Sequence, residues 1–578
     1  MKSGIPFLVI WLCASPILLG QTNILVTNLA ADAVIKGAYN PATYASSVPA
    51  ADPLAIAEAL SARISPDSLK DIITRLSAFG TRNTGSDTLS DARGVGAARR
   101  WIYDKFESYS AAAEGRLLVS YLQFDQAICA VGQHRNIFAV LPGSDTSAHG
   151  VIIVEGHMDS RCNTPCDTAC IAEGVEDNAS GTVLVMELAR VMSAYTFPNT
   201  IVFLVTIGEE QGLYGANAFA EYCENEKIPV RAVYNNDIVG GILCGKTSSP
   251  PSCPGLNDVD SVGVRLFSSG SFNSPSKQLV RFAKLEYNEI LKPTALTPMD
   301  VRIMSPEDRT GRGGDHIPFR QRGYPAIRFC SANEHGDASN GTGYTDRQHT
   351  ESDVLGVDTD GDNVIDSFFV DFNYLSRNAL INGNAITMAA QALPTPVDFT
   401  VKRNGAEFII TVNDQPPPYR VFLRTSASND FEGIFDLPDT TSGAFPCGAT
   451  GLIFVSVATV GTDGVESLFS IEKSASPAVG VEEPGAPQPV KLLQNRPNPF
   501  DEATWIVFEA ETVPAFTKAS IRIHDLTGRF VAEMPINAIK PGINELLYRH
   551  GYGQSGSYAY SLVIDGRVVD TKQMVFAN

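Results

Sequence analysis

The sequence predicts an α/β protein, in which a three-layer α/β/α sandwich with a mostly parallel central sheet is followed by two small all-β sandwich domains. Residues 151–154 and 201–205 are short runs of β-branched and apolar side chains, which is typical of strands buried on both faces. Between them, residues 180–195 have the apolar spacing of a helix. This strand–helix–strand order favours parallel pairing. From residue 393 the pattern changes to alternating strands, which indicates the all-β part.

The region before the predicted sheet falls into two parts. Residues 21–65 are rich in Ala, Ser, Pro and Thr without clear periodicity, and are interpreted as a leader or pro-segment. Residues 66–392 are predicted to form the α/β domain. This domain begins with two helices, because apolar side chains recur at helical spacing over residues 69–79 and 94–109.

The length and charge of the chain exclude some classes of protein. A chain of 578 residues is expected to hold three or four domains. Its formal net charge is −20, and no run of Lys or Arg is longer than a pair. Binding to a phosphate backbone needs a concentrated basic face. No nucleic-acid partner is therefore expected.

Residues 1–20 have the features of a secretory signal peptide. Lys2 gives a sparse positive start, residues 5–12 form an apolar run, and residues 14–20 lead to a cleavage site before Gln21. No later stretch offers about eighteen unbroken apolar residues, so no transmembrane segment is expected. The protein is therefore expected to be exported.

Export makes disulfide bonds the expected state of several cysteines. Removal of the signal leaves nine of the ten cysteines, which is an odd number. Cys162, Cys166 and Cys170 crowd one loop, where a cysteine-only zinc site is the alternative to disulfides. Cys244 and Cys253 bracket a short Pro/Ser loop and are the first expected pair.

Five clusters of possible metal ligands follow the predicted strands. In chain order they are His157-Met158-Asp159, Asp177-Asn178-Ala179-Ser180-Gly181, Glu209-Glu210, Asn236-Asp237 and His349-Thr350-Glu351-Ser352-Asp353. The clusters that contain His157, Glu209 and Asp237 come just after predicted strands. Because sites in open α/β sheets assemble at the carboxyl ends of strands, the clusters are expected to converge.

Together the clusters supply two imidazoles and three carboxylates, which suits two divalent ions about 3.5–4 Å apart. We expect Asp177 to bridge both ions. His157 and Asp237 would complete the coordination of the first ion, and Glu210 and His349 would complete that of the second. Each ion then has three protein ligands, which leaves room for a shared water, as an open catalytic site requires.

Two further carboxylates are assigned catalytic roles. Glu209 is expected to stay off the metals, to take a proton from the water and to deliver it to the leaving amine. Asp159, two residues after His157, is expected to accept the second N–H of that imidazole and so fix its tautomer. The metal ions would polarise the scissile carbonyl.

Each cluster alone has a plainer interpretation. A Glu-Glu pair after a strand is commonly a solvated helix start, Asp177-Asn178 can be a helix N-cap, and His349 can be a surface histidine. Their joint occurrence after successive strands favours the metal site. His316 is the rival to His349 for the second imidazole, and is otherwise placed behind the ligands or on the substrate side.

Three segments follow the α/β domain. Residues 393–474 are predicted to form a fibronectin type III-like β-sandwich, and residues 475–489 a linker rich in Pro, Gly, Ala and Glu. Residues 490–578 are predicted to form a second β-rich unit.

An acidic stretch within the α/β domain resembles the first half of a calcium loop, with Asp358, Asp360 and Asp362 at the required spacing. Asn363 stands at the usual glycine position, and Phe369 stands where a bidentate Glu belongs. A solvated acidic insertion is therefore favoured over calcium.

Residues 66–392 resemble the secreted bacterial leucyl-type aminopeptidases, whose catalytic domain is shared with glutamate carboxypeptidase and glutaminyl cyclase. The resemblance lies in residues 156–159, 176–181, 208–215, 236–237 and 349–350. It implies two zinc ions, a bridging Asp and a Glu base on the residues assigned above, an α/β/α sandwich, and a cis peptide bond after Asp177. The longer loop over 162–170 departs from the pattern and borders the expected substrate pocket, so it bears on specificity.

The C-terminal unit resembles the sorting domain of the type IX secretion system. The matching pieces are residues 495–500, 525–529 and 556–560. The resemblance implies export through the periplasm by the N-terminal signal, then outer-membrane passage by the type IX secretion machinery with removal of this domain. The protein would then be secreted or at the cell surface. An additional β-sandwich for adhesion is the alternative.

These inferences predict a secreted zinc metalloexopeptidase, monomeric, that removes N-terminal residues from peptide substrates. Glutaminyl cyclase, with one zinc ion in a related pocket, is the runner-up, although every ligand for two metals is present. A carboxypeptidase would need a basic pocket for the substrate carboxylate, and Arg309 and Arg312 near His316 keep that alternative open. Outside the enzymes, the alternative is a metal-free binding or adhesion module on a peptidase fold that has lost its activity.

Overall fold

The computed structural model describes most of the chain. The described residues are 21–47, 52–147, 150–243, 259–269, 274–309, 312–332, 347–425, 428–448, 452–476, 490–500, 503–513, 517–525, 530–550 and 556–576. Several predictions lie outside these residues: the signal peptide over 1–20, the disulfide bond between Cys244 and Cys253, the linker from residue 477 to 489, and residues 526–529 of the C-terminal resemblance.

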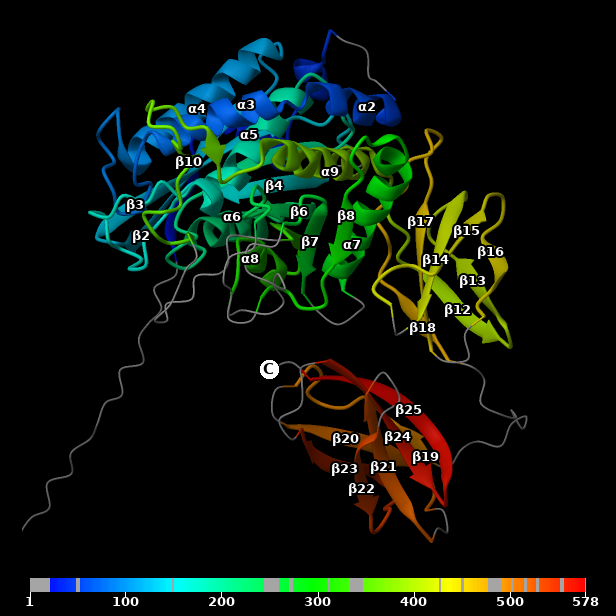
Figure 1. Cartoon of the computed structure of the whole chain (residues 1–578). Coiled ribbons are helices and arrows are strands. Elements are labelled where there is room, and N and C mark those ends of the chain that lie inside the picture. Colours follow the sequence, from blue (N-terminus) through cyan, green and yellow to red (C-terminus); the bar gives the residue numbers. More distant parts are fainter. Residues whose placement is uncertain are drawn as a thin grey trace, which may run out of the picture.

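A mixed sheet forms the centre of the α/β domain (Figure 1). Within the described residues it has nine strands, in the order β1-β2-β3-β5-β4-β6-β9-β7-β8. Their bounds are β1 (Thr22–Val26), β2 (Leu118–Ile128), β3 (Val131–Leu141), β4 (Val151–His157), β5 (Thr200–Thr206), β6 (Val230–Asn236), β7 (Gly263–Ser268), β8 (Asp300–Ile303) and β9 (Ala326–Ser331). Strands β5, β4, β6 and β9 are parallel, and β3 and β7 flank them in antiparallel pairing. The carboxyl ends of the four central strands therefore meet at one edge.

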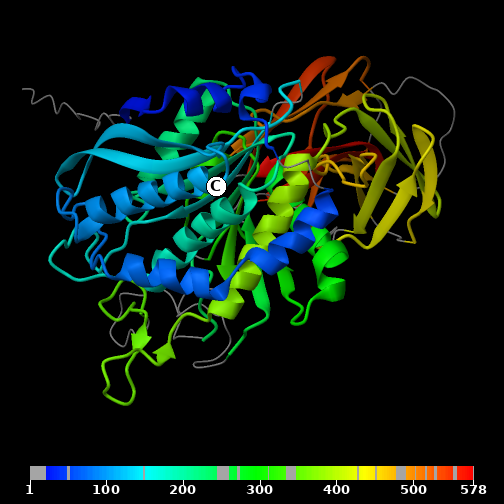
Figure 2. The same cartoon turned by 90° about the horizontal axis from the view of Figure 1, so that it is seen from above.

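Helices cover both faces of this sheet, which Figure 2 shows from above. On one face lie α2 (Pro53–Arg63), α3 (Pro66–Ser77), α4 (Gly94–Ala112), α5 (Ser180–Met192), α7 (Pro275–Glu286) and α9 (Phe372–Gln391). On the other lie α1 (Leu29–Ile35), α6 (Tyr214–Asn225) and α8 (His316–Gln321). Single turns are η1 (Pro41–Tyr44), η2 (Val175–Ala179), η3 (Tyr287–Leu291) and η4 (Lys292–Thr294), and β10 (Gly356–Val357) pairs with β11 (Ser367–Phe368). No helix in the described part of the chain is long and apolar enough to cross a membrane.

The predicted fold class is confirmed, because the strands and helices bury the residues that their patterns indicated. Every residue of β4 and β5 is buried, as expected for strands covered on both faces. α3 begins directly after Ser65, whose side chain accepts a hydrogen bond from the backbone N–H of Ser68. Its apolar face buries Leu69, Ile72 and Leu76 against α5 and α9. Local caps and apolar spacing thus place this helix layer over the sheet.

Residues 21–65 belong to the α/β domain, which corrects the N-terminal boundary predicted at residue 66. β1 pairs antiparallel with β2. α1 buries Ala31, Val34 and Ile35 against β2 and β3, while α2 packs on α9. The first two of these elements were missed because β1 has five residues and α1 seven, which is too short for a clear periodic signal.

Two disulfide bonds hold the loop that follows β4. Cys162 pairs with Cys170 inside the loop, and Cys166 pairs with Cys129 in the turn between β2 and β3. The expectation of disulfides is confirmed for these cysteines, and the alternative of a cysteine-only zinc site is excluded for them. The loop next to the metal-ligand clusters is therefore anchored to a neighbouring strand pair.

Two all-β units follow the α/β domain. In the first, β12 (Phe399–Asn404), β13 (Glu407–Val412) and β16 (Ser442–Pro446) form one sheet, and β15 (Gly433–Leu437), β14 (Tyr419–Thr425), β17 (Ile453–Thr459) and β18 (Lys473–Ala475) form another. In the second, β19 (Val490–Leu492), β20 (Ala503–Ala510) and β23 (Gly542–Arg549) face β22 (Phe530–Ile536), β21 (Ala519–Asp525), β24 (Gly556–Ile564) and β25 (Arg567–Phe576). Each unit encloses an apolar core of its own. The fibronectin type III and sorting-domain assignments stay predictions.

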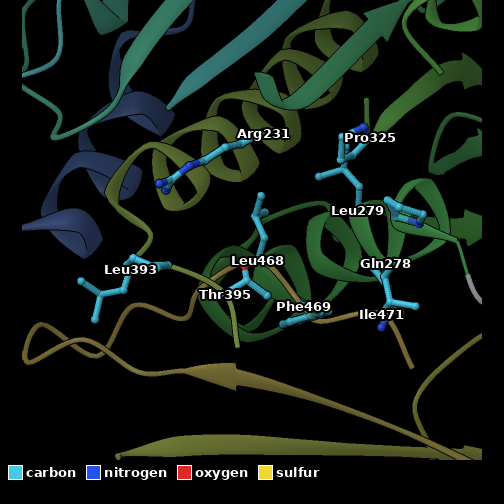
Figure 3. A pocket seen from close by; sticks show the side chains of 11 residues that line it. Arg231, Gln278, Leu279, Pro325, Leu393, Thr395, Leu468, Phe469 and Ile471 are labelled. Atoms are coloured by element: carbon cyan, nitrogen blue, oxygen red, sulfur yellow. The ribbon is translucent and has the colours of Figure 1, made fainter. Parts of the chain in front are cut away.

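The first all-β unit packs on α7 through a buried ion-pair cluster. Glu472 accepts two hydrogen bonds of 2.6 Å from Arg424 and one of 3.3 Å from Arg281 of α7. Beside this contact lies a pocket of about 300 Å³, lined mainly by apolar side chains such as Leu279 and Phe469 (Figure 3). Its lining contains no His, Cys, Asp or Glu, so this pocket is not a metal site.

Candidate metal centre

The predicted ligands meet at the edge where the four parallel strands end. His157 is the last residue of β4, Asp237 directly follows β6, and residues 209–210 come shortly after β5. Parallel strands bring their carboxyl ends together, so these side chains face a common space. Gly181, at the start of α5, permits the close packing, because a methyl group there would collide with the carbonyl oxygen of Asn236.

Asp177 lies in the turn η2 before α5, and Asp353 holds this turn in place. The peptide bond between Asp177 and Asn178 is cis, as the family resemblance implied. One carboxylate oxygen of Asp353 accepts a 2.9 Å hydrogen bond from the backbone N–H of Glu176, and the other a 3.1 Å bond from that of Asp177. Because Asp353 and His349 belong to one loop, that loop both supplies an imidazole and positions the Asp177 backbone.

The side chains form two groups that share Asp177. His157 Nε2 lies 3.3 Å from Asp177 Oδ1 and 3.7 Å from Asp237 Oδ1. His349 Nε2 lies 3.0 Å from Asp177 Oδ2 and 3.1 Å from Glu210 Oε2. The two oxygens of Asp177 thus face different imidazoles, which is the arrangement that a bridging carboxylate needs.

Glu209 lies beside the first group. Its Oε2 is 4.0 Å from His157 Nε2, which is farther than the nearest oxygens of Asp177 and Asp237. Donor atoms of Glu209, His157 and Asp237 all lie within 4.8 Å of one another. The geometry therefore leaves Glu209 close enough to act on a group held between the ligands.

The orientation of His157 depends on the backbone of Asp159, which corrects the predicted role of that carboxylate. His157 Nδ1 lies 3.0 Å from the backbone carbonyl oxygen of Asp159 and 3.7 Å from its carboxylate. Since a carbonyl can only accept, Nδ1 carries the proton and Nε2 faces the site with its lone pair. The Asp159 carboxylate instead accepts from the backbone N–H groups of Glu209 (3.4 Å) and Glu210 (3.2 Å) and from Thr84 Oγ1 (3.2 Å).

The electrostatics of the centre follow from burying many carboxylates beside two imidazoles. Burial works against charge on Asp177, but His157 and His349 outweigh it and hold the pKa of this carboxyl well below its usual range. Burial raises the pKa of the Glu209 carboxyl well above its usual range, and nearby Asp237 adds to the rise, although His157 opposes it. A raised pKa suits a group that must accept a proton and then pass it on.

The donor set fits divalent zinc. Imidazole nitrogens and carboxylate oxygens are the ligands that catalytic zinc sites use. His157 Nε2 and Glu210 Oε1 are buried without a hydrogen-bond partner, and both belong to the two groups. Buried polar atoms normally have partners, so unpartnered atoms in each of the two groups indicate a site for a bound group. The number of ions and the roles of the individual residues stay predictions.

Two arginines that the motif analysis did not identify contact the ligands. Arg161 Nε donates a 2.7 Å hydrogen bond to Glu210 Oε2, and Arg328 Nη2 lies 3.1 Å from Asp237 Oδ2. One guanidinium thus orients a carboxylate in each group. Arg161 directly follows the first cluster, but its sequence position alone gives no reason to pair it with Glu210.

Arg82 is a second kind of residue that sequence reasoning missed. Its fully buried guanidinium donates to the backbone carbonyls of Met158, Glu173 and Gly174, which lie in the segments that carry His157 and Asp177. No sequence signal could have identified it, because its partners are backbone atoms. Arg82 thus joins the segment that carries His157 to the segment that carries Asp177 by hydrogen bonds.

His316 does not contact the open site. It is the first residue of α8 and completely buried, and burial lowers the pKa of its imidazole. It is not among the residues that line the pocket at the metal centre. His316 therefore lies away from the open space in this structure. His349, whose Nε2 lies 3.0 Å from Asp177 Oδ2 and 3.1 Å from Glu210 Oε2, stays the predicted second imidazole ligand.

The acidic stretch over 358–366 brings together Asp358, Asp360 and Asp366, all exposed. Asp358 accepts hydrogen bonds from the backbone N–H groups of Gly361 (2.7 Å) and Asn363 (2.7 Å). Asp362, the third residue of the predicted calcium set, is not in this group. The loop is thus stabilised by its own hydrogen bonds, in keeping with a solvated insertion.

Comparisons with known proteins place the ligand clusters inside a family match. The model of peptidase family M28 matches residues 136–366, which contain every predicted site residue. A probable zinc metalloprotease of Leptosphaeria maculans is 31% identical over 441 residues, covering 73% of this chain and 96% of the relative. One of Pyricularia oryzae is 34% identical over 354 residues, covering 58% and 67%. The solved Legionella pneumophila LapA aminopeptidase is 19% identical with a TM-score of 0.41, covering 58% of this chain and 75% of LapA.

Proposed function

Because the chain belongs to peptidase family M28, we propose that it is a zinc-dependent aminopeptidase that hydrolyses N-terminal residues from peptides. The observation that carries this proposal is the pair of donor groups joined by Asp177. An imidazole, a second carboxylate and one oxygen of Asp177 converge on each side. Glu209 lies beside them and lines the same pocket. Such a set serves metal-assisted hydrolysis.

Two zinc ions would be held by the two groups. His157 and Asp237 would hold one, Glu210 and His349 the other, and Asp177 would bridge them. When bound, the ions would lower the pKa of a water and polarise the scissile carbonyl. Arg328 and Arg161 orient the carboxylates of Asp237 and Glu210 for this task.

The proton transfer falls to Glu209. It lines the pocket, so its carboxylate can reach a water and a peptide bound there. It would accept the proton of the attacking water and donate it to the nitrogen of the leaving amine. The backbone N–H of Glu209 is held by the Asp159 carboxylate, so Asp159 positions the base.

Removal and replacement of the metal test this proposal directly. Treatment with a chelator is expected to abolish hydrolysis of aminoacyl amides, and added zinc to restore it, because without the ions the water keeps its ordinary high pKa and Glu209 alone is too weak a base to remove its proton. Elemental analysis of the active protein should give two zinc ions per chain, and the product should be the free amino acid.

Two other results would redirect the assignment. A single zinc ion, with pyroglutamate formed from N-terminal glutamine, would establish the glutaminyl cyclase alternative. Absence of hydrolysis across a panel of substrates by the zinc-loaded protein would instead favour the metal-free binding or adhesion module.

Export is the second part of the proposal, with residues 1–20 as the signal and residues 490–578 as a type IX sorting domain. The supporting observation is that two of the matching pieces lie together. The backbone N–H of Asn495 donates to Tyr560 Oη at 2.8 Å, and Asn498 Oδ1 accepts from Val575 of β25. In a bacterium with this secretion system, the full chain is expected outside the cell, and a chain that ends at residue 489 in the periplasm. Equal export of both would contradict the sorting role.

A further inference from the structure

The pocket at the metal centre is rich in arginine. It has a volume of about 290 Å³. Besides the predicted ligands and Glu209, its charged lining residues are Arg161, Arg309, Arg312 and Arg328. The lining thus contains four carboxylates, all of them at the metal centre, and four guanidinium groups.

Acidic side chains of the protein already neutralise three of these arginines. Arg161 donates to Glu210, as described above. Arg328 Nη1 donates a 2.6 Å hydrogen bond to Asp308 Oδ2, in addition to its contact with Asp237. Arg309 Nε lies 3.7 Å from the other oxygen of Asp308. These three guanidinium groups therefore stabilise the wall of the pocket.

Arg312 differs from the other three. It is half-buried, and its Nη2 donates a 3.2 Å hydrogen bond to the neutral side-chain oxygen of Gln348. Among the residues that the structure describes, no carboxylate forms an ion pair with Arg312. Gln348 directly precedes His349, so its bond to Arg312 anchors the guanidinium on the loop that carries the second imidazole. Arg312 is thus a cation that lines the substrate space and has no acidic partner within the described part of the chain.

The charges of the lining indicate which substrate group this cation would meet. The four carboxylates and the four guanidinium groups of the lining cancel, and Asp308, which pairs with Arg328 and Arg309, adds one negative charge before any metal is counted. Two divalent cations would make the pocket strongly positive, which favours an anionic group in the substrate. Asp177, Glu210 and Asp237 belong to the metal positions, and Glu209 is taken up by the water that it is proposed to deprotonate, so no lining carboxylate is left to bind a cationic side chain.

We propose that Arg312 binds a carboxylate of the substrate and so makes this a peptidase for acidic substrates. The inference rests on the proposed function and adds a specificity-determining residue to it. The carboxylate can come from an N-terminal Asp or Glu side chain, or from the C-terminus of a short peptide. In both cases the planar guanidinium would form a charge-assisted pair with it.

Matched substrates separate the two sources. Glutamyl and glutaminyl amides differ only in a side-chain carboxylate, and alanyl-alanine and its C-terminal amide differ only in the terminal one. In the wild type, the member of one pair that carries the carboxylate is expected to have a kcat/KM about 10–100-fold higher than that of its neutral partner. The difference should lie in KM, because the contact is remote from the reacting bond. Lysyl amides should be poor substrates.

Substitutions at Arg312 test the residue itself. Arg312→Gln is expected to remove the preference and to leave the neutral member within about threefold of wild type, since the predicted ligands are untouched. Arg312→Lys should restore part of the preference, because the charge returns without the planar fork. Arg322→Gln is the matched control: Arg322 pairs with Glu224 at 3.1 Å and does not line the pocket.

A binding measurement makes the test independent of turnover. By calorimetry, glutarate is expected to bind the zinc-loaded wild type at least about tenfold more tightly than its monoamide, and Arg312→Gln should abolish the difference. Equal binding of the two compounds, or equal loss for both in Arg312→Gln, would overturn the inference. Hydrolysis of the neutral substrates would still support the proposed function in that case. Absence of all hydrolysis, with the glutarate preference intact, would overturn only the function.

Discussion

Substitution of Glu209 by Gln is expected to lower kcat by about 10²–10⁴-fold while zinc content stays at the wild-type level. Gln is nearly isosteric with Glu but cannot accept a proton at neutral pH. The backbone N–H of Glu209 would still be held by Asp159, so the side chain would keep its position. Steady-state kinetics with an aminoacyl amide, combined with elemental analysis of the same sample, measure both quantities.

The zinc content in this variant decides between two roles for Glu209. The donor atoms of Glu209, His157 and Asp237 lie within 4.8 Å of one another, so the position of Glu209 alone would also allow it to bind a metal ion. If Glu209 acts as a base, the Glu209→Gln variant has a lower kcat and an unchanged zinc content. Loss of one zinc ion from Glu209→Gln would make it a ligand, and an unchanged rate would refute the base assignment.

The sequence allowed the central part of the fold and the convergence of the site to be predicted for one physical reason. Strands buried on both faces must be continuously apolar, so the runs at 151–154 and 201–205 were visible. Parallel strands joined by helices end at one edge, so polar residues directly after them, such as His157 and Asp237, had to face a common space. The parallel connection of the strands, together with the local pattern of apolar residues, was enough to predict that these side chains lie close together.

What the sequence did not reveal depends on contacts between distant segments. Asp353 and Arg82 act on backbone atoms of the Asp177 segment, and a backbone atom has no residue type to recognise. The pairing of Cys129 with Cys166 joins a hairpin turn to a loop 37 residues later, so local spacing could not find it. The role of Asp159 was predicted with the wrong atom, because the carbonyl and the carboxylate of one residue both lie near His157.

Substitution of Asp177 by Asn is expected to cost more than the loss of any other single predicted ligand. The two carboxylate oxygens of Asp177 face His157 and His349 separately. An Asn side chain keeps one acceptor oxygen and replaces the other with an NH₂ group, which cannot bind a cation. Both metal positions therefore lose affinity together, and kcat/KM should fall by more than the roughly 10–100-fold typical for residues that only orient ligands.

The matched variant is Asp237→Asn, which changes the same side chain at a residue that faces only one group. Asp237 Oδ1 lies near His157, and nothing in the geometry connects it to His349 or Glu210. Zinc content should therefore fall toward one ion in Asp237→Asn and below one in Asp177→Asn, with thermal unfolding used to show that both variants fold. Equal zinc content in the two variants would mean that Asp177 serves one ion only, and the bridged pair of metals would have to be abandoned.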